Sequence, residues 1–150
     1  MRWRVGVASD DKARYSVTVN RNLRNIPKEI VLVAPEGELA HVKVARSYWA
    51  RGKGLLGEGS PLSEDRGLLL LPCSSVHGFW MRITIDVVFF DNNWEVLKIY
   101  PNCRPWRYLA GAKGAAMALE AGEGAIERLG LAPGAKCSWR VPPVEHVVPF

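Results

Sequence analysis

Short runs of alternating or β-branched residues, separated by turn residues, dominate the hydrophobic pattern of this chain. Residues 29–34 (EIVLVA) and 39–45 (LAHVKVA) flank the turn-forming PEGE and predict a β-hairpin. Residues 85–90 (IDVVFF) and 94–100 (WEVLKIY) flank DNN and predict another. Many short strands without regular βαβ alternation predict an α+β fold with a small, strongly curved or barrel-like sheet.

The remaining segments add strands, two short helices and one long loop to this prediction. A short helix is predicted from Ser47 to Gly57, and a second over residues 122–131. Residues 101–114 are predicted to be loop. Further strands are predicted over residues 3–8, 14–20, 66–72 and 115–121, and Pro133 and Gly134 turn the chain into residues 137–141.

Length and charge divide the chain into a globular domain and a basic extension. The 150 residues, 48% hydrophobic and 23% charged, suffice for one domain that buries roughly 70% of its unfolded surface. Residues 1–28 hold seven bases and two acids, whereas residues 29–150 hold thirteen of each, so the net charge of +5 lies in the extension. We therefore expect a basic N-terminal extension over residues 1–30, packed as a short hairpin on a single domain over residues 31–150.

Three cysteines, an odd number, exclude a complete set of intramolecular disulfides, so reduced thiols are expected. The apolar run after Met1 ends at Ser9 and is too short for a signal peptide. The longest apolar run, residues 67–72, is far shorter than the roughly 20 residues that span a bilayer. These features predict a cytoplasmic protein without a membrane span.

The densest motif lies between Cys73 and Asp91, and it carries a resemblance to a known family. The runs GLLLLPC, SVH-F-MR-T-IDVVFFD, LEAG and RLGLAPG resemble the domain-of-unknown-function 192 family over roughly Val33 to Arg140. The resemblance implies a small distorted β-barrel with one or two short helices, and it implies no particular reaction. This chain has Gly78 and Thr84 where the family commonly shows threonine and proline.

The segment from Val76 to Arg82 is the leading candidate for a binding site. It places His77, Trp80, Met81 and Arg82 in close succession, and an arginine can hold a carboxylate or phosphate through two hydrogen bonds. No complete set of catalytic residues accompanies them. The sequence therefore favours a non-enzymatic or accessory binding module for a small ligand or a protein, acting as a monomer or weak oligomer.

The alternative is a small, hydrolase-like enzyme. Cys73 and His77 could form a thiol–imidazole pair, and Asp86 and Glu120 could form a pair of carboxylates for proton transfer. The competing interpretation of the two acids is structural, with Arg82 pairing with one of them, since an unpaired buried acid is costly. Zinc binding by Cys73, His77, Cys103 and Cys137 lacks paired ligand spacing, so neither a metal nor a cofactor is predicted.

Nucleic-acid binding through the basic extension is a third hypothesis. Trp3 and Tyr15 lie among its bases, which could release counterions from a phosphate backbone. A second cluster, Arg104 to Tyr108, alternates cations with aromatic residues on a predicted loop, where stacking could occur. A solvated basic face and a packed surface loop are the competing interpretations of these two features.

Overall fold

The computed structural model describes residues 23–47, 51, 55, 59–106 and 108–144. The predicted strands over residues 3–8 and 14–20 lie outside these described residues, as does most of the predicted helix after Ser47. No helix in the described part is both long and apolar enough to cross a membrane.

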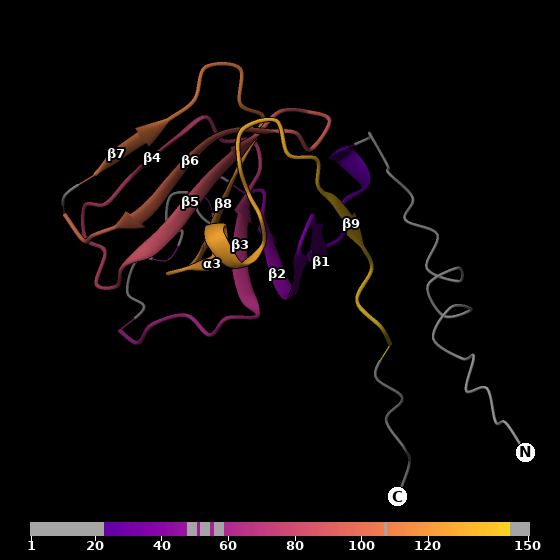
Figure 1. The fold of residues 1–150 in the computed structure, drawn as a ribbon, viewed down its shortest axis with the longest axis horizontal. Coiled ribbons are helices and arrows are strands. Elements are labelled where there is room, and N and C mark those ends of the chain that lie inside the picture. The colour runs from indigo at the N-terminus through magenta and orange to yellow at the C-terminus, as the bar shows by residue number, and fades with distance from the viewer. Residues whose placement is uncertain (1–22, 48–50, 52–54, 56–58, 107, 145–150) are drawn as a thin grey trace, which may run out of the picture.

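A curled, mostly antiparallel seven-stranded sheet forms the body of the protein (Figure 1). Its order is β6-β5-β8-β3-β2-β1-β9, and only β2 and β3 run parallel. The strands are β1 (Glu29–Ala34), β2 (Gly37–Ala45), β3 (Arg66–Leu70), β5 (Ile85–Phe90), β6 (Val96–Cys103), β8 (Met117–Gly122) and β9 (Ser138–Arg140). The short 3-10 helix η1 (Leu23–Asn25) precedes β1. The predicted curved sheet is confirmed.

The β5–β6 hairpin forms where the sequence predicts it, closed by the Asp91 side chain. An Asp91 carboxylate oxygen accepts hydrogen bonds from the backbone N–H groups of Asn93 at 2.7 Å and Glu95 at 3.0 Å. The positive φ of this turn falls on Trp94, at 62°, rather than on the asparagines before it. Trp94 is buried, so packing of its ring holds a backbone conformation that bulky residues rarely adopt.

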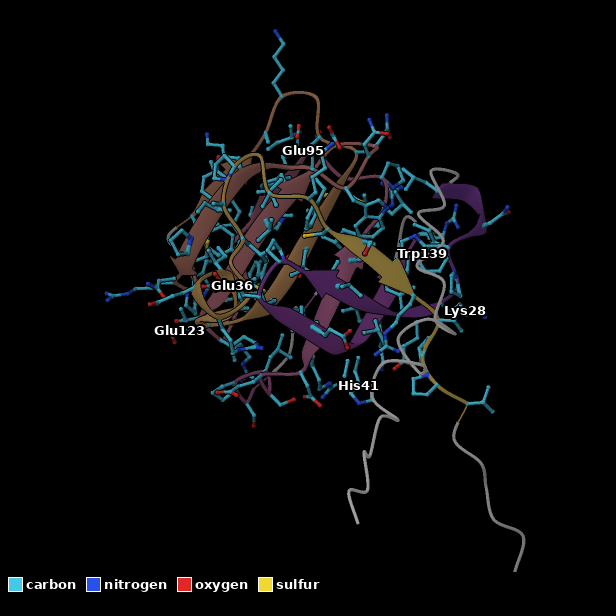
Figure 2. The ribbon with its side chains drawn as sticks, turned by 45° about the vertical axis from the view of Figure 1, so that its right-hand side comes forward. Lys28, Glu36, His41, Glu95, Glu123 and Trp139 are labelled. Carbon is cyan, nitrogen blue, oxygen red and sulfur yellow. The ribbon has the colours of Figure 1, made fainter. Side chains whose placement is uncertain are left out.

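The sheet separates two apolar clusters because alternate residues of its central strands point to opposite faces. On β5, Val88 and Phe90 pack in one cluster with Ile126 of the short helix α3 (Ala125–Arg128). Val87 and Phe89 pack in the other. We call these faces the helix side and the ribbon side. Figure 2 shows Glu36 beside α3, where its backbone N–H donates to the Leu129 carbonyl.

The ribbon side is named for a two-stranded sheet that the sequence did not predict. β4 (Ser75–His77) pairs antiparallel with β7 (Leu109–Gly111), which lies inside the segment predicted to be loop. Each strand has three residues, too few to show an alternating pattern. The ribbon lies at the opposite end of the molecule from β9 (Figure 1). Its buried Ala110 joins the cluster on the ribbon side of the main sheet.

Candidate functional site

The predicted binding segment is divided between surface and core. His77, Trp80 and Arg82 are exposed, and 69% of Trp80 is accessible to solvent. Met81 is buried and packs with Ile83 and Ile85 in the ribbon-side cluster. Met81 therefore anchors the segment instead of offering a contact surface.

Trp80 occupies a turn position that usually favours glycine. The Met81 backbone N–H donates to the Gly78 carbonyl at 3.2 Å and closes a four-residue turn, in which Trp80 has a φ of 68°. Such a conformation costs a non-glycine residue on the order of 1–3 kcal/mol. Trp80 recovers little of this cost by burial because most of its side chain faces water.

A second exposed tryptophan, on the loop between β6 and β7, has the same backbone conformation. Trp106 has a φ of 65° and is 53% exposed. Its backbone N–H donates to the Gly78 carbonyl at 2.8 Å, and the Gly78 N–H donates to the Tyr108 carbonyl at 2.9 Å. Gly78 thereby fastens the two loops together and fixes the relative position of the two tryptophans.

Five exposed side chains of these loops and of the ribbon form what we call the aromatic surface. The ring centroids of Trp80 and Trp106 lie 4.8 Å apart in an edge arrangement, and Phe79 lies 6.3 Å from Trp106. His77 lies 5.2 Å from Phe79. Leu109, directly opposite His77 in the ribbon, is 75% exposed. A shallow hollow of about 310 Å³ adjoins them, lined by residues 75–77 and 109–111.

Phe79 lies within the predicted segment from Val76 to Arg82, but the sequence analysis does not single it out as a contact residue. Leu109 lies outside that segment and stands in no recognisable strand or helix pattern, so the sequence does not predict it. The sequence indicates Trp106 only as part of the cluster from Arg104 to Tyr108, in which cations alternate with aromatic residues. The contact between that cluster and the segment from Val76 to Arg82 depends on the unpredicted β4–β7 pairing.

Gly78 is required by packing as well as by hydrogen bonding. A Cβ at this position would lie 2.5 Å from a ring carbon of Tyr108, closer than real Cβ atoms approach other atoms. The threonine that the family resemblance implies at this position would therefore meet the Tyr108 ring. The Tyr108 ring that makes this contact carries a buried hydroxyl group beneath the aromatic surface.

Cys73 and His77 do not form the thiol–imidazole pair suggested by the sequence. The Cys73 thiol donates to the Ser75 carbonyl at 3.2 Å, whereas His77 is exposed and contacts Phe79. Burial raises the pKa of the Cys73 thiol, nearby Glu120 raises it further, and the Ser75 hydrogen bond and Arg51 oppose these effects. A raised pKa keeps the thiol protonated near neutral pH and so disfavours it as a nucleophile.

Asp86 and Glu120 do not form a carboxylate pair, because they point to opposite faces of the sheet. Asp86 is paired with Ala121 across the β5–β8 ladder and Glu120 with Val87, one position along. The Asp86 carboxylate accepts backbone N–H groups of Asn102 and Ile126, both at 3.0 Å. Asp86 is therefore structural, since it joins β6 to the first turn of α3.

Arg82 pairs with neither acid. Among the described residues it forms no ion pair, and Asp86 uses its oxygens on backbone groups instead. The exposed side chain of Arg82, two residues after Trp80, therefore remains available to a partner.

Glu120 lies buried on the ribbon side, between apolar neighbours. It is 4% exposed, and its Oε2 atom has no hydrogen-bond partner among the described residues. Burial raises the pKa of Glu120 to about 7, while a hydrogen bond from the Leu55 backbone lowers it. Burial also raises the pKa of the Tyr108 phenol, and Glu120 adds to that rise. This enclosed carboxylate can exchange a proton near neutrality, but it has no exposed face for a substrate.

The third cysteine is separated from the other two by the sheet. Cys137 packs in the helix-side cluster, whereas Cys103 and Cys73 belong to the ribbon side. Burial raises the pKa of Cys137 to about 12 and that of Cys103 to about 11. No group of three or more metal-ligating side chains occurs within the described ranges.

Comparison with known proteins identifies the family. The model of the DUF192 family, described as Uncharacterized ACR, matches residues 31–139. The chain belongs to this family. A UPF0127 protein of Thermococcus sibiricus is 30% identical over 113 residues, covering 72% of this chain and 71% of the relative. A UPF0127 protein of Pyrococcus horikoshii is 32% identical over 111 residues, covering 69% and 89% respectively.

A solved structure supports the fold of this DUF192 member. The crystal structure of a protein of unknown function from Novosphingobium aromaticivorans aligns with a TM-score of 0.65 and 24% identity, covering 74% of this chain and 84% of that one. At this identity the likeness concerns the fold alone. The family is uncharacterised, so membership supplies no specific activity, and any function has to be argued from the site.

Proposed function

We propose that this protein is a non-enzymatic binding module whose contact surface is the aromatic surface formed by His77, Phe79, Trp80, Trp106 and Leu109. The observation that carries the proposal is the pair of exposed tryptophans at positive φ. Strained backbone persists only where surrounding structure holds it, and it gathers at functional sites. Here the two strained positions carry large rings that are exposed to water and add little to the apolar core.

Preorganisation supports the proposal further. Hydrogen bonds to both backbone groups of Gly78 hold the two loops before any partner arrives. The Tyr100 hydroxyl donates to the Gly111 carbonyl at 2.6 Å and accepts from its N–H at 3.2 Å, which fixes β7 against β6. A surface ordered in advance loses less entropy on binding, and tryptophan is enriched among residues that dominate binding energy.

The arrangement of the ionisable groups argues against the enzymatic alternative. The two buried acids are on opposite faces, and the Cys73 thiol has a raised pKa and no imidazole partner. Glu120, one oxygen of which has no hydrogen-bond partner among the described residues, is enclosed. By contrast, the aromatic surface is open and continuous across both loops.

The experiment is affinity capture from a cell extract, with immobilised full-length protein and analysis of retained proteins, nucleic acids and small molecules. We expect Trp80→Ala combined with Trp106→Ala to abolish specific retention. The matched control is Val141→Ser, an exposed apolar residue that follows β9. Equal retention by the wild type and the double variant, with both folded by circular dichroism, would exclude this surface as the contact site.

A further inference from the structure

The two segments that build the aromatic surface carry bases and no acids. Residues 72–85 and 101–119 hold Arg82, Arg104, Arg107 and Lys113, and neither segment contains aspartate or glutamate. The rest of residues 29–150 holds the other nine of its thirteen bases and all thirteen acids. The domain is therefore neutral only on average, because these two segments carry a net charge of +4 and the rest of residues 29–150 carries a net charge of −4.

Two exposed arginines close in sequence to the tryptophans, Arg82 and Arg104, are free to contact an anionic partner. Arg82 follows Trp80 by two positions, and Arg104 precedes Trp106 by two. Both are exposed, and neither forms an ion pair among the described residues. At the other end of the sheet Arg140 of β9 pairs with Glu38 of β2, and His41 of β2, labelled in Figure 2, lies 3.2 Å from Glu29 of β1. The exposed Lys43 of β2 forms no ion pair among the described residues.

The arrangement of the rings suits a partner whose planar groups are separate from one another better than a partner whose planar groups form one continuous stack. The planes of His77 and Phe79 are inclined by 33°, those of Phe79 and Trp106 by 54°, and those of Trp80 and Trp106 by 62°. Their faces thus point in different directions. The bases of a single strand can turn individually toward such faces, whereas bases stacked inside a duplex cannot.

We propose that the aromatic surface binds single-stranded nucleic acid, with bases stacking on Phe79, Trp80 and Trp106 and phosphates contacting Arg82 and Arg104. Alternation of cations with aromatic rings matches a polymer that offers one phosphate and one planar ring per nucleotide. This inference rests on the proposed function, since it names the partner of the same surface. It places the contact on residues between Phe79 and Trp106, not on the basic residues 1–30.

The test is fluorescence anisotropy of labelled 12-nucleotide thymidine and uridine strands, titrated with full-length protein at several salt concentrations. A 12-base-pair duplex serves as the competing substrate. We expect the wild type to bind at least one single strand, roughly tenfold more tightly than the duplex. Binding should also quench tryptophan fluorescence, because stacked bases contact the indole rings.

Variants assign the binding to the aromatic surface. Trp80→Ala and Trp106→Ala should each weaken binding by roughly tenfold or more, and Trp80→Phe with Trp106→Phe should restore part of the loss by keeping a stacking ring. Arg82→Gln with Arg104→Gln should lower the slope of log affinity against log salt by about 1.4, or roughly 0.7 per lost phosphate contact. Lys43→Gln with Lys136→Gln removes the same charge elsewhere and should change that slope less.

The outcomes separate the two proposals. Absence of single-strand binding at low salt would overturn the nucleic-acid inference. Binding unchanged by the tryptophan variants but lost on replacing Arg2, Arg4, Lys12 and Arg14 by glutamine would also overturn it, since the contact would then lie in the extension. If oligonucleotides fail but both tryptophans are still needed to retain a protein in the capture experiment, the proposed function stands with a protein partner.

Discussion

The two sides of the sheet differ in how completely the buried acid on each side is hydrogen-bonded. On the helix side, each oxygen of Asp86 accepts a backbone N–H. On the ribbon side, one carboxylate oxygen of Glu120 and the hydroxyl group of Tyr108 have no hydrogen-bond partner among the described residues. The indole N–H groups of Trp94 and Trp139 are also unpaired on the helix side, but they are neutral donors. The unmatched oxygen atoms of ionisable side chains, those of Glu120 and Tyr108, therefore lie on the ribbon side.

The fully hydrogen-bonded acid on the helix side stabilises the fold, whereas the incompletely hydrogen-bonded acid lies on the side that carries the aromatic surface. Three local features on the ribbon side depart from what a stable fold favours: one oxygen of a buried acid has no partner among the described residues, a glycine is closely packed against a neighbouring ring, and two exposed tryptophans have a positive φ. On the helix side Trp94 also has a positive φ, but its ring is buried. Natural sequences tend to show such departures at functional sites. Four substitutions test the contrast.

The largest effect is expected for Asp86→Ala. It would leave the N–H groups of Asn102 and Ile126 without their acceptor, and hydrogen bonds to a buried charge each contribute on the order of 1.5–3 kcal/mol, so we expect a loss of at least about 3 kcal/mol. Urea denaturation measures it. The matched control is Asp91→Ala, which also removes two N–H bonds but at a less buried turn. An equal loss in both variants would contradict the role given to Asp86.

Glu120→Gln tests the ribbon side through the pH dependence of stability. The folded pKa of about 7 exceeds the ordinary value of 4.5, so the folded state retains a proton that the unfolded state has already released between these values. Stability should therefore fall as pH rises from 4.5 to about 7, in total by on the order of 3 kcal/mol. Urea denaturation at pH 4.5, 6 and 8 should show this slope in the wild type and lose most of it in Glu120→Gln. A wild-type slope preserved in Glu120→Gln and altered in the exposed control Glu123→Gln would assign the proton elsewhere.

Most of the sheet was predictable because its strands carry a periodic or fully apolar pattern. β1, β2, β3, β5, β6 and β8 lie within or close to their predicted ranges, and α3 is shorter than the predicted helix. The β4–β7 ribbon was not predictable because three-residue strands contain too little pattern to detect. Without this ribbon, the sequence does not predict that the loops carrying Trp80 and Trp106 meet, as they do through hydrogen bonds at Gly78 and through their rings.

The candidate site was predicted in part. His77, Trp80 and Arg82 are exposed as a binding role requires, whereas Met81 is buried. The direction of a side chain relative to a curved sheet depends on register, so the separation of Asp86 from Glu120 became clear only from the β5–β8 pairing. Likewise, no local sequence feature indicates that Gly78 lies against Tyr108.

Gly78→Ala tests that contact, with a smaller expected effect. The added methyl group would meet the Tyr108 ring, and overpacking of this kind costs about 2 kcal/mol. Tyr108→Leu in the same chain should recover part of the loss, which a double-mutant cycle measures as coupling. Gly59→Ala is the control, because among the described residues no atom beyond its chain neighbours lies within 4 Å of the added Cβ. If Gly78→Ala proved as harmless as Gly59→Ala, the two loops would not be packed together through this glycine.

The smallest effect concerns the strained turn itself and compares glycine with alanine at two neighbouring positions. At Trp80, with a φ of 68°, glycine relieves a strain that alanine retains, so Trp80→Gly should be more stable than Trp80→Ala by about 1 kcal/mol. At Phe79, which lacks a positive φ, the order should reverse, because glycine loses more conformational freedom on folding. Thermal unfolding of the four variants measures both differences. The same order at both positions would mean that Trp80 carries no strain. The predicted reversal, together with weaker partner binding by both Trp80 variants, would show that the chain sacrifices stability to keep this ring exposed.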